Sequence, residues 1–187
     1  NQAVDLNENC GAGEFNPTDS WTWEEAARDE HLLIKSLEKC EAGKIVAVAL
    51  DGDGDRCLFI ESTADGVRVV DGDEMADHIL RSAKGEWILA SSIESDLALA
   101  SSLQRLDAKV EFTQTAVGDR WLAHALKSSN KEKLGVEDSG HLVLASPHPE
   151  IDGEWSLVGD GAATLILQLL VRATLFNNEK IVPSFQR

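Results

Sequence analysis

Three aspartates, Asp51, Asp53 and Asp55, stand at alternate positions of one short loop and are separated by single glycines. The mostly apolar residues 44–50 precede the loop and residues 57–60 follow it, and both runs are typical of buried strands. Carboxylates this close repel one another, and the glycines let the backbone bend so that alternate side chains converge on one point. A hard divalent cation with oxygen ligands is the simplest partner that makes such a cluster favourable. The loop therefore predicts a metal site.

Other acidic loops fit this pattern less well. In an EF-hand that begins at Asp51, Arg56 would occupy the position that needs glycine, and Ser62 the position that needs glutamate. A turn whose aspartates only cap backbone groups has little use for three carboxylates followed by arginine. A haloacid-dehalogenase-type phosphotransferase stays open as an alternative, with Asp51 as nucleophile and Asp53 as acid or base. No convincing downstream pair of a lysine and an acidic residue supports it.

The chain is strongly acidic, since 33 acidic and 17 basic residues among 187 give a net charge of −16. A surface of this sign repels phosphate backbones and anionic lipids, so nucleic-acid and membrane binding are disfavoured. An anionic ligand would need arginine, lysine, a cation or a helix N-terminus to reverse this field locally. No apolar run approaches the ~20 residues that a membrane span needs.

The cysteines Cys10, Cys40 and Cys57 stand far apart without a CxxC pair, which argues against a zinc site or a disulfide framework. Cys57 lies in a predicted strand, and we expect it to be a small buried hydrophobic residue. These features favour reducing surroundings, and we expect a cytoplasmic protein. No signal peptide is visible, and the start at Asn1 rather than methionine indicates a piece of a longer protein.

Alternating strand and helix patterns predict an α/β fold. Helices are expected from Thr22 toward Lys39, over 95–106, over 117–126 and from about 160 to 173. A further helix is expected to begin at Asp73, which would be its N-terminal cap. Strands are expected at 44–50, 57–60, 67–70, 87–90, 109–113, 134–137 and 142–145, with a hairpin turn at 62–66. In the helix over 117–126, Val117, Trp121 and Leu122 are expected to point inward. This order predicts a three-layer α/β/α sandwich with a mixed, largely parallel sheet, plus part of a preceding α/β domain.

Several segments in order resemble motifs of the α-D-phosphohexomutases, the family that includes phosphoglucosamine mutases and phosphomannomutase/phosphoglucomutases. They are Leu6–Gly11, Asp51–Arg56, Val70–Asp73, Thr115–Arg120, Gly135–His141 and Gly159–Gly161. Asp51–Arg56 closely resembles the metal-binding loop of the family. Gly135–His141 is similar to its sugar-binding loop, although Asp138 stands where methionine or asparagine is usual. Thr115–Arg120 resembles the Thr-Lys-Val-Gly-Asp-Arg stretch of phosphoglucosamine mutases, which favours this branch slightly.

The resemblance implies a phosphoserine enzyme that passes its phosphoryl group to a hexose phosphate and takes the other one back from a bisphosphate intermediate. Asp51, Asp53 and Asp55 would hold Mg²⁺ together with one oxygen of the phosphoserine. Arg56 would serve catalysis by donating to the phosphoryl oxygens. The enzyme would thus interconvert hexose 1-phosphate and hexose 6-phosphate.

The same resemblance assigns the sugar contacts. Glu137 and Ser139 would hydrogen-bond hydroxyl groups of the sugar. His141 would act in catalysis as a proton carrier for the reacting hydroxyl. Arg120 would either line the site as a substrate-binding residue or pair with an acidic neighbour such as Asp119.

The resemblance also divides the chain into parts of a larger enzyme. Residues 1–70 would be the end of domain II, residues 71–176 domain III and residues 177–187 a linker toward domain IV. The chain contains neither a Ser-His-Asn-Pro phosphoserine loop nor the phosphate-binding loop of the fourth domain. Domains I and IV of the same protein would therefore be its partners, and the chain alone would turn over nothing. A non-catalytic module that binds a divalent cation and a sugar phosphate stays open as an alternative.

Overall fold

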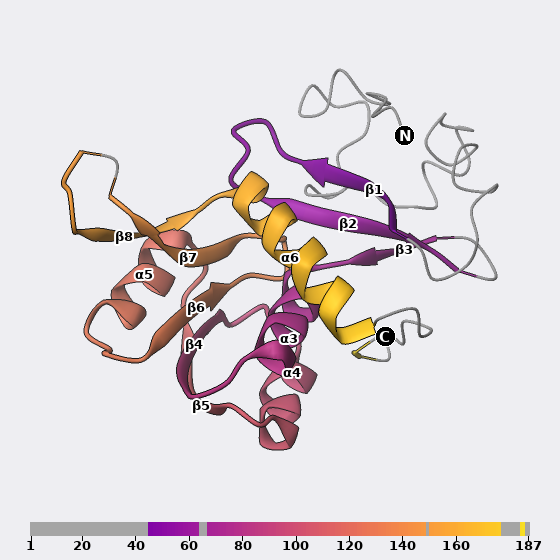
Figure 1. The fold of residues 1–187 in the computed structure, drawn as a ribbon. Helices are drawn as coiled ribbons and strands as arrows, with labels where there is room; N and C mark the ends of the chain where they lie inside the picture. Colours follow the sequence, from indigo (N-terminus) through magenta and orange to yellow (C-terminus); the bar gives the residue numbers. More distant parts are fainter. Residues whose placement is uncertain (1–44, 64–66, 149, 177–183, 186–187) are drawn as a thin grey trace.

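The described part of the chain forms two β-sheets, with helices packed around the second one (Figure 1). The computed structural model describes residues 45–63, 67–148, 150–176 and 184–185. The predicted helix from Thr22 toward Lys39, the segment Leu6–Gly11, the cysteines at 10 and 40 and most of the tail after residue 176 lie outside the described residues. Among the described residues, no helix combines the length and the apolar character that a membrane span requires.

The first sheet is an antiparallel meander of β1 (Ile45–Leu50), β2 (Cys57–Ser62) and β3 (Val67–Val70). The acidic loop joins β1 to β2, and the two strands pair at Leu50 and Cys57. Ser62 pairs with Val67, which confirms the predicted hairpin between β2 and β3. All six residues of β2 are buried, which confirms the buried strand predicted at 57–60. The acidic loop thus extends from the end of a well-anchored strand pair.

The second sheet has the strand order β5-β4-β6-β7-β8. Its strands are β4 (Glu86–Ser92), β5 (Lys109–Thr115), β6 (Glu132–Val136), β7 (Leu142–Pro147) and β8 (Trp155–Gly159). β4 pairs in parallel with β5 and β6, and β7 is antiparallel to both of its neighbours. Four of the five strands therefore run in one direction, and the predicted mixed, largely parallel sheet is confirmed. β8 was not predicted, because it is an edge strand whose exposed Trp155 and Val158 break the alternation expected of a strand.

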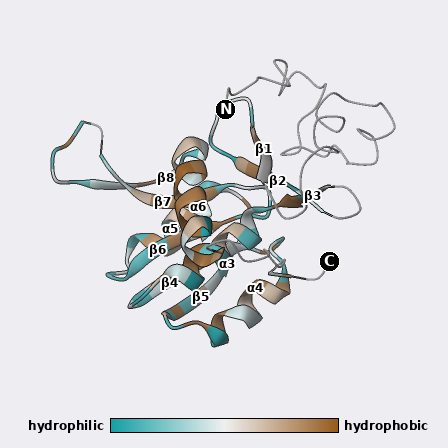
Figure 2. Cartoon of the chain, turned by 45° about the vertical axis from the view of Figure 1, so that its right-hand side comes forward, coloured by the Kyte–Doolittle hydropathy of each residue, from teal (hydrophilic) through white to brown (hydrophobic). Residues whose placement is uncertain are grey.

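Helices cover both faces of the second sheet. Met75 of α3 (Gly72–Ser82) and Val171 of α6 (Gly161–Phe176) share one core with Leu89. Leu122 of α5 (Asp119–Lys127) packs with Ile88 in a second core. Because Ile88 and Leu89 are consecutive in β4, their side chains point to opposite faces of the sheet. The predicted three-layer sandwich is therefore confirmed, and Figure 2 shows the hydrophobic residues, in brown, concentrated on α6 and α3 where they cross the sheet.

The N-terminal cap of α3 differs from the prediction. Asp71, and not Asp73, caps the helix, because its Oδ1 accepts a hydrogen bond from the Glu74 N–H at 3.0 Å. Asp73 Oδ2 instead accepts a hydrogen bond from the Asp96 N–H at 2.7 Å, just before α4 (Leu97–Ser102). Both positions carry aspartate, so residue type alone could not distinguish the cap from a tertiary contact.

Two other helix predictions were wrong in detail. The helix expected over 95–106 is the shorter α4 followed by the 3₁₀ turn η1 (Leu103–Arg105), because Asp96 caps it at the Ala98 N–H. Val117 and Trp121 are 47% and 43% exposed rather than inward. Gly118, with φ 119°, keeps Val117 outside α5. Leu122 takes the inward position, so its neighbour Trp121 is rotated about 100° away from the core.

The N-terminus of α6 contacts the acidic loop through backbone atoms. The Gly161 N–H donates a hydrogen bond to the Gly54 carbonyl at 2.8 Å. A Cβ atom at position 161 would lie 2.5 Å from the Arg56 carbonyl oxygen and 2.7 Å from that of Gly54. Only glycine therefore lets the helix approach the loop this closely. The contact holds the acidic loop against α6, a helix that packs on the second sheet.

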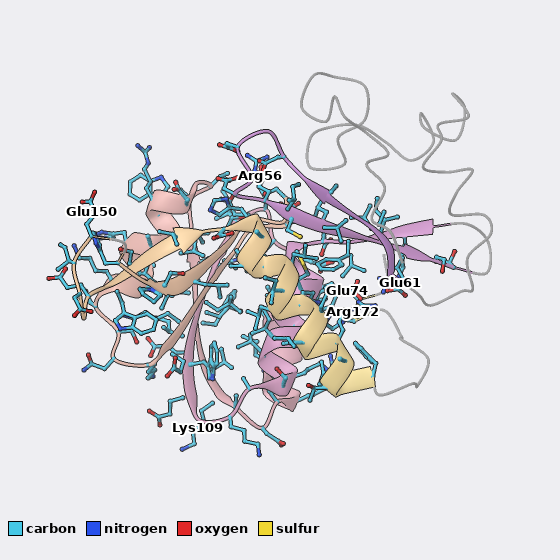
Figure 3. All side chains as sticks on the ribbon, turned by 45° about the horizontal axis from the view of Figure 1, so that its top comes forward. Arg56, Glu61, Glu74, Lys109, Glu150 and Arg172 are labelled. Atoms are coloured by element: carbon cyan, nitrogen blue, oxygen red, sulfur yellow. The ribbon has the colours of Figure 1, made fainter. Side chains whose placement is uncertain are left out.

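A buried network of charged side chains joins the first sheet to α3 and α6 (Figure 3). Glu61 Oε2 accepts hydrogen bonds from Arg172 Nη2 at 2.7 Å and from Arg68 Nη2 at 3.1 Å. Arg68 also donates to both carboxylate oxygens of Glu74, at 2.6 and 2.9 Å. Because each buried charge faces charges of opposite sign, the network avoids the cost of an isolated buried ion.

His78 of α3 lies beside this network and is fully buried. Its Nδ1 lies 2.7 Å from Gln168 Nε2 of α6, so the amide donates and Nδ1 accepts. Burial, followed by the positive charges of Arg172, Arg81 and Arg68, lowers the pKa of His78 to about 3. The imidazole is therefore neutral in the folded chain near pH 7.

We expect the stability of the fold to decrease as the pH falls from 7.5 to 5.5. The unfolded chain binds a proton at His78 near its ordinary pKa of 6.5, whereas the folded chain does so only near pH 3. The contribution of neutral His78 is therefore complete above pH 6.5 and is lost as the pH falls toward 3. About 1.4 kcal/mol should disappear between pH 7.5 and 5.5. Urea unfolding at both pH values measures this loss, and His78→Gln should reduce it. An equal loss in both proteins would contradict the assignment.

We expect Gly161→Ala to lower the free energy of unfolding by about 1–3 kcal/mol, because the added methyl group meets two backbone carbonyls that cannot move independently. Gly52→Ala is the matched control, since a Cβ atom at that position in the same loop meets nothing within 4 Å. Urea unfolding of both variants and the parent chain measures the difference. A Gly161→Ala variant as stable as the parent would argue against the tight contact between α6 and the loop.

Candidate active site

The acidic loop brings its three carboxylates to one point. Asp51, Asp53 and Asp55 each offer one oxygen atom, and these oxygens lie within 4.8 Å of one another. The loop turns at Gly54, whose φ is +77° and whose N–H donates to the Asp51 carbonyl at 3.2 Å. Asp53 is exposed, while Asp51 and Asp55 are half-buried. The three residues that the sequence predicts as metal ligands are thus adjacent in space.

Arg56 provides positive charge beside this cluster (Figure 3). Its backbone N–H donates to Asp51 Oδ1 at 3.1 Å, and its Nε lies 3.5 Å from Asp51 Oδ2 and 4.0 Å from Asp55 Oδ1. The pKa of Asp55 is nevertheless raised above its ordinary value, chiefly by burial; His141 opposes this rise, while Asp51 and Asp53 add to it. The cluster therefore retains an excess of negative charge that a cation would relieve.

A second loop, Glu137–His141, connects β6 to β7 and packs against the first sheet. The Gly140 N–H donates to the Glu137 carbonyl at 3.1 Å, and the Glu137 N–H donates to the His141 carbonyl at 3.0 Å. The Cys57 N–H donates to the Gly140 carbonyl at 3.1 Å, and Arg56 forms an isolated β-bridge with His141. Backbone pairing therefore attaches this loop to the start of β2, directly after the acidic loop.

His141 links the two loops through its side chain. Its Nδ1 lies 3.2 Å from Asp55 Oδ2. The side chain is 6% exposed, and a Cβ atom at Gly159 would lie 2.5 Å from its Nε2. Nε2 is buried and has no hydrogen-bond partner among the described residues. Gly159, which was noted in the sequence only as part of the family-like segment Gly159–Gly161, therefore makes room for the histidine.

Glu137 and Ser139 differ in how their polar atoms are satisfied. Glu137 is 8% exposed, and its Oε1 accepts a hydrogen bond from the Gly118 N–H at 2.6 Å. Ser139 Oγ is buried and lacks a hydrogen-bond partner within the described part of the chain. The Gly118 contact was not predicted, because it depends on how the segment before α5 packs against the Glu137–His141 loop.

Arg120 lies in the first turn of α5 and is exposed. Its guanidinium carbon lies 5.0 Å from the centroid of the Trp121 ring, and its backbone N–H donates to Asp119 Oδ1 at 2.6 Å. The side chain lines a groove between α5 and β8. The structure thus connects the acidic loop with Glu137–His141, whereas the described contacts of Arg120 are with its neighbours on α5.

The chemistry of the acidic loop suits a hard cation. Asp51, Asp53 and Asp55 form the one group of ligand-type side chains found close together among residues 45–63, 67–148, 150–176 and 184–185. Mg²⁺ prefers oxygen ligands and is usually bound by a few carboxylates that leave positions for water or phosphate. The exposed Asp53 leaves one side of the cluster open for such ligands.

Comparisons with known proteins identify the family. Residues 71–175 match the family model of phosphoglucomutase/phosphomannomutase, α/β/α domain III. The chain is 33% identical over 156 residues to a phosphoglucosamine mutase of Actinobacillus pleuropneumoniae serotype 5b, which covers 80% of this chain and 30% of that protein. It is 33% identical over 167 residues to the phosphoglucosamine mutase of Bacillus pumilus, covering 87% of this chain and 31% of that protein.

A solved structure supports the fold. The phosphoglucomutase/phosphomannomutase family protein of Burkholderia thailandensis superposes with a TM-score of 0.55 at 22% identity, over 84% of this chain and 31% of that chain. The present chain thus spans about a third of the length of the relatives it matches. Since the family model covers more than half of the chain, the chain belongs to the phosphoglucomutase/phosphomannomutase family of α-D-phosphohexomutases.

Proposed function

We propose that the protein containing this chain is a Mg²⁺-dependent phosphohexomutase that interconverts hexose 1-phosphate and hexose 6-phosphate. It would work through a phosphoserine enzyme and a hexose bisphosphate intermediate. The observation that carries this proposal is the contact between the acidic loop and the Glu137–His141 loop, with Asp55 Oδ2 3.2 Å from His141 Nδ1. Candidate metal ligands and candidate sugar ligands are thereby adjacent, as phosphoryl transfer to a sugar requires.

Asp51, Asp53 and Asp55 are the residues that would hold Mg²⁺. Their oxygens already lie within 4.8 Å of one another, and the raised pKa of Asp55 reflects burial and like charges that a bound cation would offset. When bound, the cation would neutralise negative charge on the phosphoryl group during transfer. Arg56 would donate hydrogen bonds to the phosphoryl oxygens, from a position where Asp51 orients its backbone and side chain.

The sugar would bind to the second loop. Glu137 Oε1 is held by the Gly118 N–H, which leaves Oε2 to accept a hydrogen bond from a sugar hydroxyl. The buried, unpartnered hydroxyl of Ser139 favours a ligand that supplies its missing hydrogen bond. Nε2 of His141 is buried, so proton exchange with the reacting hydroxyl would use Nδ1, the nitrogen that contacts Asp55. Arg120 remains a candidate substrate-binding residue at the start of α5.

We propose glucosamine phosphate as the preferred substrate over mannose and glucose phosphates. Relatives that are 33% identical over most of this chain are named phosphoglucosamine mutases. The Val117–Arg120 segment, which resembles the same branch, lies next to Glu137 through the Gly118 hydrogen bond. The group that distinguishes glucosamine from the other sugars, an amine in place of a hydroxyl, would therefore be bound close to this segment.

We further propose that residues 1–70 complete domain II, residues 71–176 form domain III and residues 177–187 lead toward domain IV. The chain spans about a third of its relatives, which leaves room for the phosphoserine of domain I and the phosphate-binding loop of domain IV elsewhere in the protein. The isolated chain would then be inactive. A cytoplasmic location fits the free thiol of Cys57.

Asp53→Asn in the full-length protein should reduce mutase activity by about 100-fold or more, because it removes one charged ligand from the proposed Mg²⁺ site. The coupled assay would compare glucosamine, mannose and glucose 6-phosphates at varied Mg²⁺, with the highest kcat/KM expected for glucosamine. Asp152→Asn is the matched control, since it removes a carboxylate that is also exposed, from the β7–β8 turn. Normal turnover by Asp53→Asn would refute the metal assignment.

Full-length enzyme incubated with a ³²P-labelled hexose bisphosphate should carry its label on a serine outside this chain. The phosphoserine bond survives acid, whereas an acyl phosphate on Asp51 is labile to hydroxylamine. Peptide mapping after each treatment distinguishes the two. Hydroxylamine-sensitive label at Asp51 would support the haloacid-dehalogenase-type reaction, and a protein that binds Mg²⁺ and sugar phosphate but takes up no label would be the non-catalytic module.

A further inference from the structure

A groove between α5 and the β6–β7–β8 side of the second sheet concentrates positive charge. It encloses about 410 Å³. Its polar lining comes from Arg120, His124 and Lys127 of α5, Lys133 of β6 and Ser156 of β8. No acidic side chain contributes to the lining, although the chain as a whole has a net charge of −16.

The cations of this groove differ from most others in the described part of the chain. Arg56, Arg68, Arg81, Lys131 and Arg172 each form an ion pair with a carboxylate. Arg120, Lys127 and Lys133 form none with any carboxylate among the described residues. Their positive charge is therefore not neutralised by an ion pair, and it leaves a small area of this acidic chain favourable for an anion.

The shape of the groove favours a small ligand over a macromolecule. Its volume lies within the range of about 300–1,000 Å³ that is typical of small-molecule sites. Lys127 and Lys133 lie near one end, where α5 finishes and β6 begins. Trp155, which also lines the groove, is 68% exposed and offers a flat aromatic face to a ligand ring.

We propose that this groove binds a phosphate ester, with the phosphoryl group at Lys127 and Lys133 and the ring of the ligand against Trp155. Charge-assisted hydrogen bonds from the lysines would hold the phosphate, and the indole would cover an apolar or aromatic face of the rest of the molecule. Arg120 is the one lining residue that is also a candidate for the sugar site. The lining includes no residue of the acidic loop or of the Glu137–His141 loop, and the phosphoryl group is placed at Lys127 and Lys133, so the proposal does not depend on the metal site.

The experiment is a titration of the full 187-residue chain, in metal-free buffer at constant ionic strength, with inorganic phosphate and with phenyl phosphate. Amide chemical shifts from ¹⁵N-labelled protein report the binding site and the affinity. Both probes should shift amides of residues 123–127, 133 and 155–157 and saturate. Phenyl phosphate should bind about tenfold more tightly, because its ring contacts Trp155.

The double variant Lys127→Gln/Lys133→Gln should weaken both probes by about tenfold or more. The matched control is Lys84→Gln/Lys109→Gln, which removes the same charge from two exposed lysines outside the groove and should leave both affinities unchanged. Trp155→Ser should abolish the advantage of phenyl phosphate without affecting inorganic phosphate. The proposal would be overturned by three results. One is equal weakening by both lysine pairs, which would mean that the phosphate responds only to the overall charge of the protein. The others are absence of saturable binding and shifts confined to other residues. Strong shifts with an acidic peptide, but not with phenyl phosphate, would reassign the groove to a protein partner.

Discussion

The backbone hydrogen bond from Gly161 to Gly54, at 2.8 Å, is the constraint on which the candidate site depends. It fixes the acidic loop of the first sheet against the N-terminus of α6, a helix that covers the second sheet. The Gly140 carbonyl accepts from the Cys57 N–H at 3.1 Å on the other side of the same loop. A hairpin loop held from two sides loses the freedom to separate its carboxylates. The cluster of aspartates can therefore persist although its members repel one another.

Two groups of charged residues in this chain differ in how far their charges are balanced. Glu61, Glu74, Arg68 and Arg172 are buried or nearly so, and each finds its opposite charge within hydrogen-bond distance. Such a network joins the first sheet to α3 and α6 without leaving an isolated ion. Removing one member would leave its partner as a buried charge without an opposite charge. The acidic loop has no comparable balance, since Arg56 lies within 4.0 Å of Asp51 and Asp55 but three carboxylates share the loop, and the pKa of Asp55 is raised. The clustered carboxylates of this loop disfavour folding when nothing is bound to them, and a bound cation would remove that cost.

Features that depend on neighbours in sequence could be predicted, and features that depend on distant segments could not. The acidic loop and its flanking strands follow from residues 44–60, because alternate aspartates and apolar runs report local geometry directly. The 3.2 Å contact of Asp55 with His141 and the hydrogen bond of Gly118 to Glu137 arise only when separate strands pair. Local rules also failed where two equivalent residues competed, since Asp71 and Asp73 are both good caps and only the fold assigns one to α3.

The distribution of charge bears on what the candidate site lacks. The proposed substrate, a hexose phosphate, is dianionic, and the arginine beside the acidic loop, Arg56, already lies within 4.0 Å of Asp51 and Asp55. A carboxylate-rich loop in a chain of net charge −16 would repel such a substrate unless further positive charge reached it. The divalent cation proposed at the three aspartates would supply part of that charge. The chain spans about a third of its relatives, so under the proposed function the groups that would bind the far phosphate would come from elsewhere in the protein, and the acidic loop would need their positive charge before it could accept an anionic substrate.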